Sequence, residues 1–206
     1  MGRPSNAQAR LLDAAMALMA ARGSTAVGVQ ELCQQAGVKK GSFFHFFPSK
    51  RTLILAVLDA WGHHLQALWD QAMTADCPPL ERLTRLFELT SATHHARRDA
   101  GGQMHGCPIG HLALELSRQD ALICQKVQAI FTGWAAVVER MLHDAVATGA
   151  LPAIDTGTTA QAIVAYFEGV LLLATTQNDP ALITRLAQGA VHLAVAGSRA
   201  HLPARR

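Results

Sequence analysis

The thiol of Cys107 is the side chain of this chain best suited to covalent chemistry. Cys107 directly precedes Pro108 at a predicted helix start, where unpaired backbone amides and the helix dipole favour a thiolate over a thiol. His105 lies two residues before it and His111 about one helical turn after it, so a protonated imidazole could favour the thiolate further. The pattern predicts a cysteine that can be modified, and the alternative is a small side chain that only packs.

Metal binding and hydrolysis are alternative chemistries for the same segment. Cys107 and His111 could place two ligands on one helix face, with His94 and His95 as further candidates, but zinc needs three or four ligands. A thiol or metal hydrolase built on Cys107 and these histidines is the alternative function, although the chain has no phosphate-cradling glycine loop, serine elbow or paired carboxylates. We therefore expect no enzymatic activity, no metal and no cofactor.

The cysteine spacing also bears on disulfides. The four cysteines stand at positions 33, 77, 107 and 124. In a cytoplasmic chain, four such scattered cysteines do not indicate a structural disulfide framework. A reversible regulatory disulfide stays open as an alternative to covalent modification of Cys107.

Residues 29–50 form a second candidate site, because they predict two short helices around a tight turn. The apolar residues at helical spacing in the first helix are Val29, Leu32, Cys33 and Ala36. Gly37 follows where a helix ends with a left-handed residue, and Val38 can fill the turn. This arrangement is typical of a helix-turn-helix that reads DNA, and the alternative is any small helical hairpin with a solvated basic turn.

The second helix of this segment has one packing side and one open side. Phe43, Phe46 and Phe47 share the first side. Gly41, Phe44 and His45 share the second, and a glycine there favours close approach of another backbone. Three cations, Lys39, Lys40 and Lys50, bracket the helix, and Pro48 ends it. We expect the open side to face bases and the lysines to meet phosphates.

The distribution of charge supports a nucleic-acid partner more strongly than its sum does. The 206 residues carry a net charge of only +3. Residues 1–51 contain seven Lys and Arg residues, including Arg3, and only two acidic residues, Asp13 and Glu31, so their net charge is +5. The rest of the chain therefore has a net charge of −2. A basic head on a slightly acidic body is the pattern expected when one domain docks on phosphates.

Composition predicts an all-α protein with two domains. Half the residues are hydrophobic and only 5% are aromatic, and no sustained alternation of β-branched residues indicates strands. No uncharged apolar segment reaches the length of a bilayer span, and the N-terminal residues lack the apolar core of a signal peptide. These features predict a cytoplasmic protein without a membrane partner.

The predicted helices divide into a head and a body. A helix over 7–21 supports the hairpin, and a long connecting helix, capped by Ser49, extends to Met73 before a break at 76–79. The expected helices of the body span 80–95, 107–116, 121–148, 159–176 and 180–196. We assign DNA binding to residues 1–50, and ligand sensing and dimerisation to residues 51–206, beginning with the connecting helix.

The last two predicted helices are apolar on more than one stripe. A second buried face is most simply supplied by a second copy of the chain, which would give a two-fold four-helix bundle. The alternative is that these helices are merely central in one chain. The candidate interface residues are Ile163, Phe167, Val170, Leu171, Leu186 and Val191.

A non-covalent ligand pocket is also expected in the body. Its candidate apolar walls are Trp69, Phe87, Leu112, Phe131, Trp134 and Phe167, with His95, His111, Gln103 and Glu168 as candidate polar contacts. The same residues could equally form the core. Aromatic residues at helical spacing do not by themselves define a ligand.

The order of elements in residues 7–58 resembles the TetR family of one-component transcriptional repressors. The most specific matches are Glu31-Leu-Cys-Gln-Gln-Ala-Gly-Val38, Lys40-Gly-Ser-Phe43 and Phe47-Pro-Ser-Lys50. The resemblance implies a homodimer whose heads enter successive major grooves of a near-palindromic operator. It also implies a body that dimerises through its last two long helices and releases DNA when a small-molecule inducer binds.

Carried over by position, the resemblance assigns Lys40, Gly41, Ser42, Phe44 and His45 to bases and backbone, and Gln30, Lys39 and Lys50 to phosphates. Position 44, where most members have Tyr, and position 46, where they have Tyr or His, both carry Phe, so those polar contacts are missing. Gly28 stands where a hydroxyl residue usually caps the next helix. Residues 106–110, Gly-Cys-Pro-Ile-Gly, resemble the corresponding helix start in members that sense electrophiles or oxidants through a cysteine.

Overall fold

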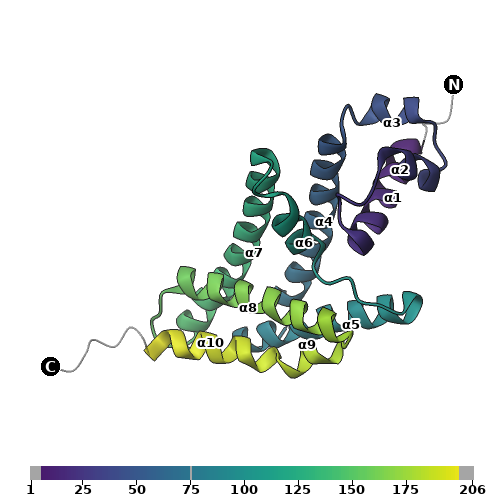
Figure 1. Cartoon of the computed structure of the whole chain (residues 1–206). Helices are drawn as coiled ribbons and strands as arrows, with labels where there is room; N and C mark the ends of the chain where they lie inside the picture. Colours follow the sequence, from purple (N-terminus) through teal and green to yellow (C-terminus); the bar gives the residue numbers. More distant parts are fainter. Residues whose placement is uncertain (1–5, 75, 200–206) are drawn as a thin grey trace. The chain divides into compact units, whose positions relative to one another are not determined.

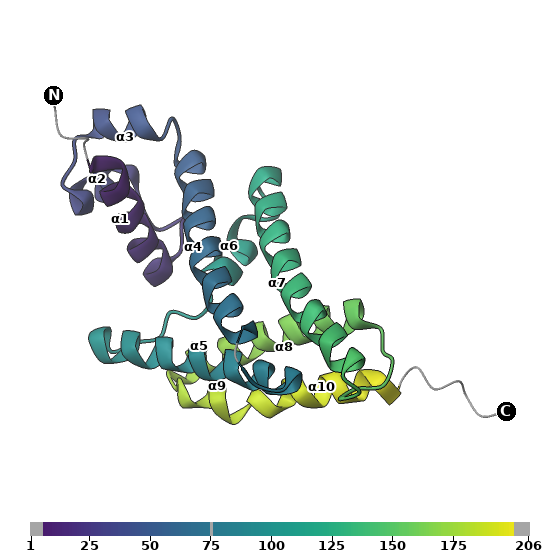
Figure 2. The same ribbon diagram turned by 180° about the vertical axis from the view of Figure 1, so that it is seen from behind.

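The computed structural model describes residues 6–74 and 76–199, which contain ten helices and no strand (Figures 1 and 2). The all-α prediction is therefore confirmed. The chain divides into two compact units. Unit 1 comprises residues 1–64 and 108–128, and unit 2 comprises residues 65–107 and 129–206.

Unit 1 contains the predicted helix-turn-helix. Its elements are α1 (Ala7–Arg22), α2 (Val29–Ala36), α3 (Lys40–Phe46), the first part of α4 (Lys50–Met73), α6 (Pro108–Leu116) and the start of α7 (Ala121–Ala147). Its core is made of fully buried apolar side chains, among them Leu11, Leu32, Phe43, Leu53 and Leu58. Burial of these side chains fixes α2 and α3 against α1.

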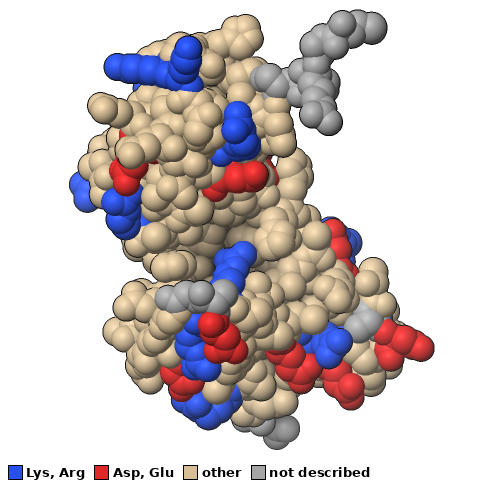
Figure 3. Space-filling model, turned by 90° about the vertical axis from the view of Figure 1, so that its right-hand side faces the viewer, with Lys and Arg blue, Asp and Glu red and all other residues tan. Residues whose placement is uncertain are grey.

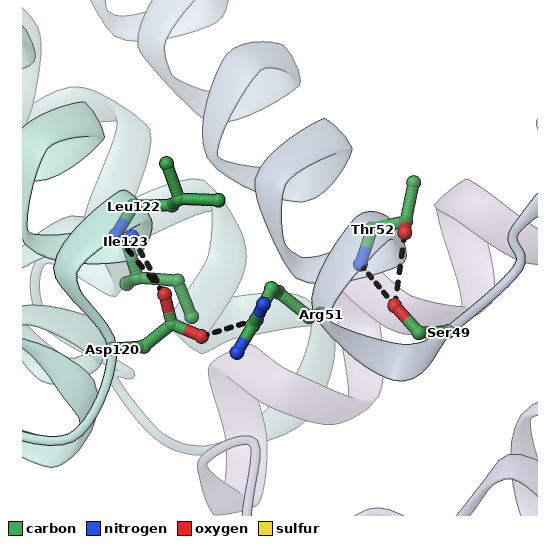
Figure 4. A network of polar contacts seen from close by, with 6 residues as sticks. All are labelled: Ser49, Arg51, Thr52, Asp120, Leu122 and Ile123. Atoms are coloured by element: carbon green, nitrogen blue, oxygen red, sulfur yellow. Dashed lines mark hydrogen bonds and ion pairs between the residues drawn. The ribbon is translucent and has the colours of Figure 1, made fainter.

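Local hydrogen bonds explain where the helices of unit 1 begin and end. Gly37 ends α2 in the left-handed conformation, with φ of +61°, as its position predicts. Ser49 caps α4, because its hydroxyl accepts a 3.1 Å hydrogen bond from the amide of Thr52 (Figure 4). Asp120 caps α7 in the same way, with its carboxylate accepting from the amides of Leu122 and Ile123.

Unit 2 contains the rest of α4 and α7 and four further helices. These are α5 (Pro79–Gly101), α8 (Thr156–Gln177), α9 (Ala181–Arg185) and α10 (Ala187–Arg199). Helix α10 packs against α8 and α5, and α9 also contacts both (Figures 1 and 2). Asp155 caps α8 through a 3.0 Å hydrogen bond from the amide of Thr158.

Helix α5 is longer than the sequence predicts. The sequence predicts a helix over 80–95 and a break of the pattern at residues 97–102, where two glycines stand, but α5 continues to Gly101. Neither arginine nor alanine opposes helix formation, and the helix ends only where Gly102 adopts φ of +82°. The prediction of a break at Arg97 is therefore wrong.

The last predicted helix is instead two helices, broken at Leu186 between α9 and α10. The hydroxyl of Tyr166 in α8 donates a 2.7 Å hydrogen bond to the carbonyl oxygen of Leu186. A Cβ atom on Gly189 would lie 2.0 Å from that hydroxyl, so only glycine leaves room for it. The carbonyl oxygen of Leu186 also accepts a 3.0 Å hydrogen bond from the amide of Gly189, three residues on, which is a tighter turn than the α-helical pattern.

Two described helices, α7 and α8, have the length and mean hydropathy of a membrane span. The core helix of a globular protein passes the same test. Both helices bury large side chains inside the protein, including Trp134 of α7 and Phe167 of α8.

Candidate nucleic-acid interface

Helix α3 has a buried face and an exposed face, as its sequence predicts. Phe43 is fully buried and Phe47, at its end, is nearly so, whereas Phe46 is half-buried. Gly41, Phe44 and His45 are exposed, and nothing lies within 4 Å of the position that a Cβ atom on Gly41 would take. The open face therefore presents a bare backbone beside one aromatic ring and one imidazole.

The polar residues assigned to DNA are mostly accessible. Gln30, Lys39 and Lys40 are exposed, and Ser42 is half-buried in the first turn of α3. Figure 3 shows Lys and Arg side chains projecting from the surface at the end that carries α1 to α3, with some acidic side chains among them. Lys39 and Lys40 stand together at the N-terminal end of α3, where the helix dipole also favours a phosphate.

Lys50 is partly committed to the fold. Its ammonium group donates a hydrogen bond to the backbone carbonyl oxygen of Ser24, a buried residue of the turn between α1 and α2. This bond ties the start of α4 to that turn. The ammonium group has two further protons, so a phosphate contact stays a prediction.

Two other cations of the head form ion pairs within unit 1. Arg22 pairs with Glu31, and Arg51 pairs with Asp120 (Figure 4). Both arginine side chains are about half exposed, so each pair adds little stability. Arg3, the first of the predicted cations, lies outside the described residues.

Glu115 of α6 supports the head, and no local pattern in the sequence indicates this role because its partners lie 90 residues away. Its carboxylate accepts hydrogen bonds from the amide of Ser24, at 2.8 Å, and from the amide and hydroxyl of Thr25. Burial alone would raise the pKa of Glu115, but the bonds from Thr25 and Ser24 hold it below its usual value. Glu115 and Lys50 thus fix the turn that precedes α2.

The predicted sensor residue Cys107 has a carboxyl partner whose residue is half-buried. Cys107 is 7% exposed and lies in unit 2, where its thiol is hydrogen-bonded to the carboxyl group of Glu168 in α8. Burial raises the pKa of Glu168 to about 7, although the bond to Cys107 opposes the shift. Among the described residues, the other oxygen of this carboxyl group, Oε1, is buried without a hydrogen-bond partner.

The aromatic residues predicted to line a ligand pocket pack on one another in unit 2. Trp69 stacks on Trp134 with ring centroids 5.2 Å apart, and Phe167 meets Trp69 edge-on at 5.3 Å. Phe87 and Phe131 extend this cluster at each end. In this structure these rings form the core of unit 2, so their role as pocket walls stays a prediction.

The polar candidates for the pocket are less closely gathered. His95 of α5 is half-buried, Gln103 is exposed, and His111, also half-buried, belongs to unit 1 together with the buried Leu112. A shallow depression of unit 2 is lined by other residues, namely Cys77, Glu81, Thr84, Arg85 and Glu88. Within residues 6–74 and 76–199, no group of three His, Cys, Asp or Glu side chains is placed to hold a metal ion.

The candidate interface residues face inward within one chain. Ile163, Phe167, Val170 and Leu171 are buried in unit 2, and Leu186 and Val191 are half-buried. The exposed apolar residues of the same helices are Ala162, Ala165, Leu172 and Leu173 of α8 and Val195 and Ala196 of α10. Both faces of α8 are therefore apolar, as its sequence predicts.

Comparisons with known proteins agree with this geometry. Residues 11–57 match the family described as bacterial regulatory proteins, tetR family, and residues 79–190 match the tetracyclin repressor-like C-terminal domain. The transcriptional regulator AcuR of Cereibacter sphaeroides is 30% identical over 190 residues, which covers 87% of this chain and 84% of AcuR. The repressor DhaR of a Mycobacterium species is 28% identical over 153 residues, or 73% of each chain.

Solved structures show the same fold. The regulatory protein TetR from Rhodobacter sphaeroides superposes with a TM-score of 0.81 at 26% identity, over 92% of this chain and 99% of that one. The reduced form of Escherichia coli NemR superposes with a TM-score of 0.76 over 91% of this chain and 96% of that one, at 21% identity, which shows the fold alone.

These matches do not support the hydrolase alternative. The relatives are named as regulators and repressors, and the Cys107 thiol is buried against a carboxyl group that burial itself keeps largely protonated below pH 7. Both parts of the chain match one family, and the observed helices follow its order. The chain belongs to the TetR family of bacterial transcriptional regulators.

Proposed function

We propose that this protein is a homodimeric, cytoplasmic repressor that binds a near-palindromic operator and is released by a small-molecule or electrophilic inducer. The observation that carries the proposal is the open face of α3, where Gly41, Phe44 and His45 are exposed beside Lys39 and Lys40. DNA binding is assigned to residues 1–50, and sensing and dimerisation to residues 51–206. Glu115 lies in the second segment but holds the first.

Lysines bind most of the phosphates in this proposal, because the phenylalanines at positions 44 and 46 cannot. Lys40→Ala should weaken binding and flatten the dependence of log K on log salt by about 0.9 for each phosphate that is no longer neutralised. Lys50→Ala should flatten it as well, and should also lower stability because it breaks the bond to Ser24. Fluorescence anisotropy of a labelled duplex from the promoter of the protein's own gene, titrated at several salt concentrations, measures both slopes.

Arg140→Ala is the matched control for charge. Arg140 is an exposed arginine of unit 2, so removing it changes the net charge equally without touching the head. Its salt slope should equal that of the wild type. A Lys40→Ala slope that also equals the wild-type slope would remove Lys40 from the interface.

The proposed dimer interface lies on the exposed faces of α8 and α10. Ala162, Ala165, Gly169 and Leu172 recur every three or four residues on one side of α8, and Leu173 widens this stripe. The small residues allow close approach of a second helix. Ile163, Phe167, Val170 and Leu171, which the sequence pattern places in the interface, lie behind this surface and support it.

Modification of Cys107 is the proposed covalent input. The thiol loses its proton to solvent, and the thiolate adds to one carbon of the double bond of an electrophile such as N-ethylmaleimide. A carbon–sulfur bond forms, the π bond breaks, and the other carbon takes up a proton from solvent. The group so attached would not fit a site where the thiol is 7% exposed and bonded to Glu168, so α8 or the backbone around Cys107 would have to move. Modification would break the contact with Glu168, and this is how it would act on α8.

Release by N-ethylmaleimide is expected from wild-type protein on its operator and not from Cys107→Ser. Cys77→Ser and Cys124→Ser are the controls, because those two cysteines are half-buried and lie outside this contact. Both controls should release like the wild type. Equal release from Cys107→Ser would eliminate this thiol, and a non-covalent ligand beside the aromatic cluster would then be the input.

A further inference from the structure

Phe44 is an exposed aromatic side chain of unit 1. Its surface is 47% exposed, whereas Phe43, Phe47 and Trp61 of the same unit are buried. An aromatic ring that is left in water forgoes the stabilisation of burial, and the ring lies on the face of α3 opposite the core. A role outside the folded chain accounts for its exposure.

The ring of Phe44 is held in place. It meets the ring of Phe43 edge-on, with centroids 5.1 Å apart and planes at 83°. Phe43 is itself fully buried, and its carbonyl oxygen accepts a 2.8 Å hydrogen bond from the amide of Phe47. A ring fixed in this way loses little conformational entropy when it contacts a partner.

Gly41 leaves the surface beside this ring without a side chain. It lies three residues before Phe44 on the same face, and side chains of a helix lean toward its N-terminus. Beyond the two residues next to it in the chain, no side chain, that of Phe44 included, lies within 4 Å of the position that a Cβ atom on Gly41 would take. The glycine is not needed for internal packing, and a bare backbone lets a second molecule come close to the ring.

A phenyl ring can read only one feature of a base-pair edge. It has no hydrogen-bond donor or acceptor, so it recognises neither the polar groups of bases nor a phosphate oxygen. The apolar group exposed in the major groove is the C5-methyl group of thymine. We propose that Phe44 is a specificity-determining residue that selects thymine in each half-site by packing on this methyl group; the proposal rests on the DNA-binding function proposed above.

Replacing single thymines by deoxyuridine tests the proposal, because this change removes only the methyl group. The probe is a duplex selected from a random library by the full-length wild-type chain. One thymine position of the half-site should be sensitive to this change. Deoxyuridine at that position in one half-site should weaken wild-type binding about fourfold, and deoxyuridine in both half-sites about sixteenfold. Cytosine at that position should bind poorly, and 5-methylcytosine should recover part of the loss.

Variants at position 44 complete the test as a double-mutant cycle. Phe44→Ala should bind the thymine duplex more weakly than wild type and show no further loss with deoxyuridine. Phe44→Leu should keep part of the deoxyuridine effect. Leu122→Ala is the matched control, because Leu122 is an apolar residue of unit 1 with similar exposure, 51%, and should behave as wild type on every duplex.

Two results would overturn the proposal. One is a wild-type affinity that no thymine-to-deoxyuridine change alters, and the other is an equal deoxyuridine penalty in wild type and Phe44→Ala. Either result leaves the repressor function standing, because a specific duplex has still been selected. Failure to select any duplex contradicts the DNA-binding function itself and, with it, this proposal.

Discussion

Leu172→Arg should convert the protein from a dimer into a folded monomer. Leu172 is 61% exposed in one chain and its neighbour Leu173 is 50% exposed. Full burial of a leucine side chain is worth about 1.5–3 kcal/mol of free energy, so a second chain that covers these residues is stabilised. In a two-fold interface each substitution occurs twice, and a guanidinium group buried without a partner adds a larger penalty. Sedimentation velocity at micromolar concentration measures the change.

Operator binding should fall together with dimerisation. A dimer binds its second half-site at a high effective concentration, and a monomer without this link binds about 100-fold more weakly or worse. Circular dichroism of Leu172→Arg should keep the helical signal of the wild type, because Leu172 contributes little to the core of one chain. Ile163→Ala should behave oppositely, lowering stability by about 2–5 kcal/mol, because Ile163 is fully buried.

Leu114→Arg is the control for this experiment. Leu114 of α6 is 84% exposed, more than Leu172, but lies in unit 1. It should remain dimeric. A dimeric Leu172→Arg protein would show that the interface lies elsewhere than the exposed face of α8.

His94→Gln and Glu168→Gln should change the pH dependence of stability in opposite directions. Burial, with help from the charges of Arg97 and His105, lowers the pKa of His94 from 6.5 to about 4. The unfolded chain therefore binds a proton below pH 6.5 that the folded chain does not. The contribution of His94 is fully present above pH 6.5 and is lost as the pH falls toward 4, by about 3 kcal/mol.

The contribution of Glu168 to stability depends on pH in the opposite direction. Burial raises its pKa from 4.5 to about 7, so the folded chain keeps a proton that the unfolded chain releases above pH 4.5. Its contribution is fully present below pH 4.5 and is lost as the pH rises toward 7, by an amount on the order of 3 kcal/mol. In the wild type the two effects partly cancel between pH 4.5 and 6.5.

The measurement is urea unfolding at pH 4 to 8 at one fixed protomer concentration, because dimerisation makes stability concentration-dependent. Relative to the wild type, Glu168→Gln should lose more stability toward acid, and His94→Gln should lose less. His63→Gln, a change at an exposed histidine, should follow the wild-type curve. Parallel curves for all four proteins would contradict the burial of both groups.

Much of the head could be predicted from sequence because its signals are local. Gly37, Ser49 and the alternation of buried and exposed phenylalanines act within one or two helical turns, so their structural consequences follow directly from spacing. The extension of α5 to Gly101 and the break at Leu186 do not follow from spacing. Helix α5 meets no strong stop before Gly102. The break at Leu186 coincides with a hydrogen bond from the hydroxyl of Tyr166, 20 residues away.

The contacts that connect distant segments could not be predicted at all. Glu115 lies 90 residues from the turn it holds, and Glu168 lies on a different helix from the segment of Cys107. The same holds for the two apolar faces of α8. The sequence shows that both faces are apolar, but only the packing of the chain shows that Ile163 faces the core and Leu172 faces outward. Contacts between residues that are far apart in the sequence can be identified only from the folded structure.

The affinity of the full-length protein for the promoter of its own gene, measured by fluorescence anisotropy at several salt concentrations, decides whether the protein binds an operator. We expect specific binding that weakens about 1,000-fold or more between roughly 50 and 200 mM salt if six or more phosphates are contacted. A scrambled duplex of the same length should bind far more weakly. Equal affinity for both duplexes, or no binding to any fragment from the neighbourhood of the gene, would contradict the assignment as an operator-binding repressor.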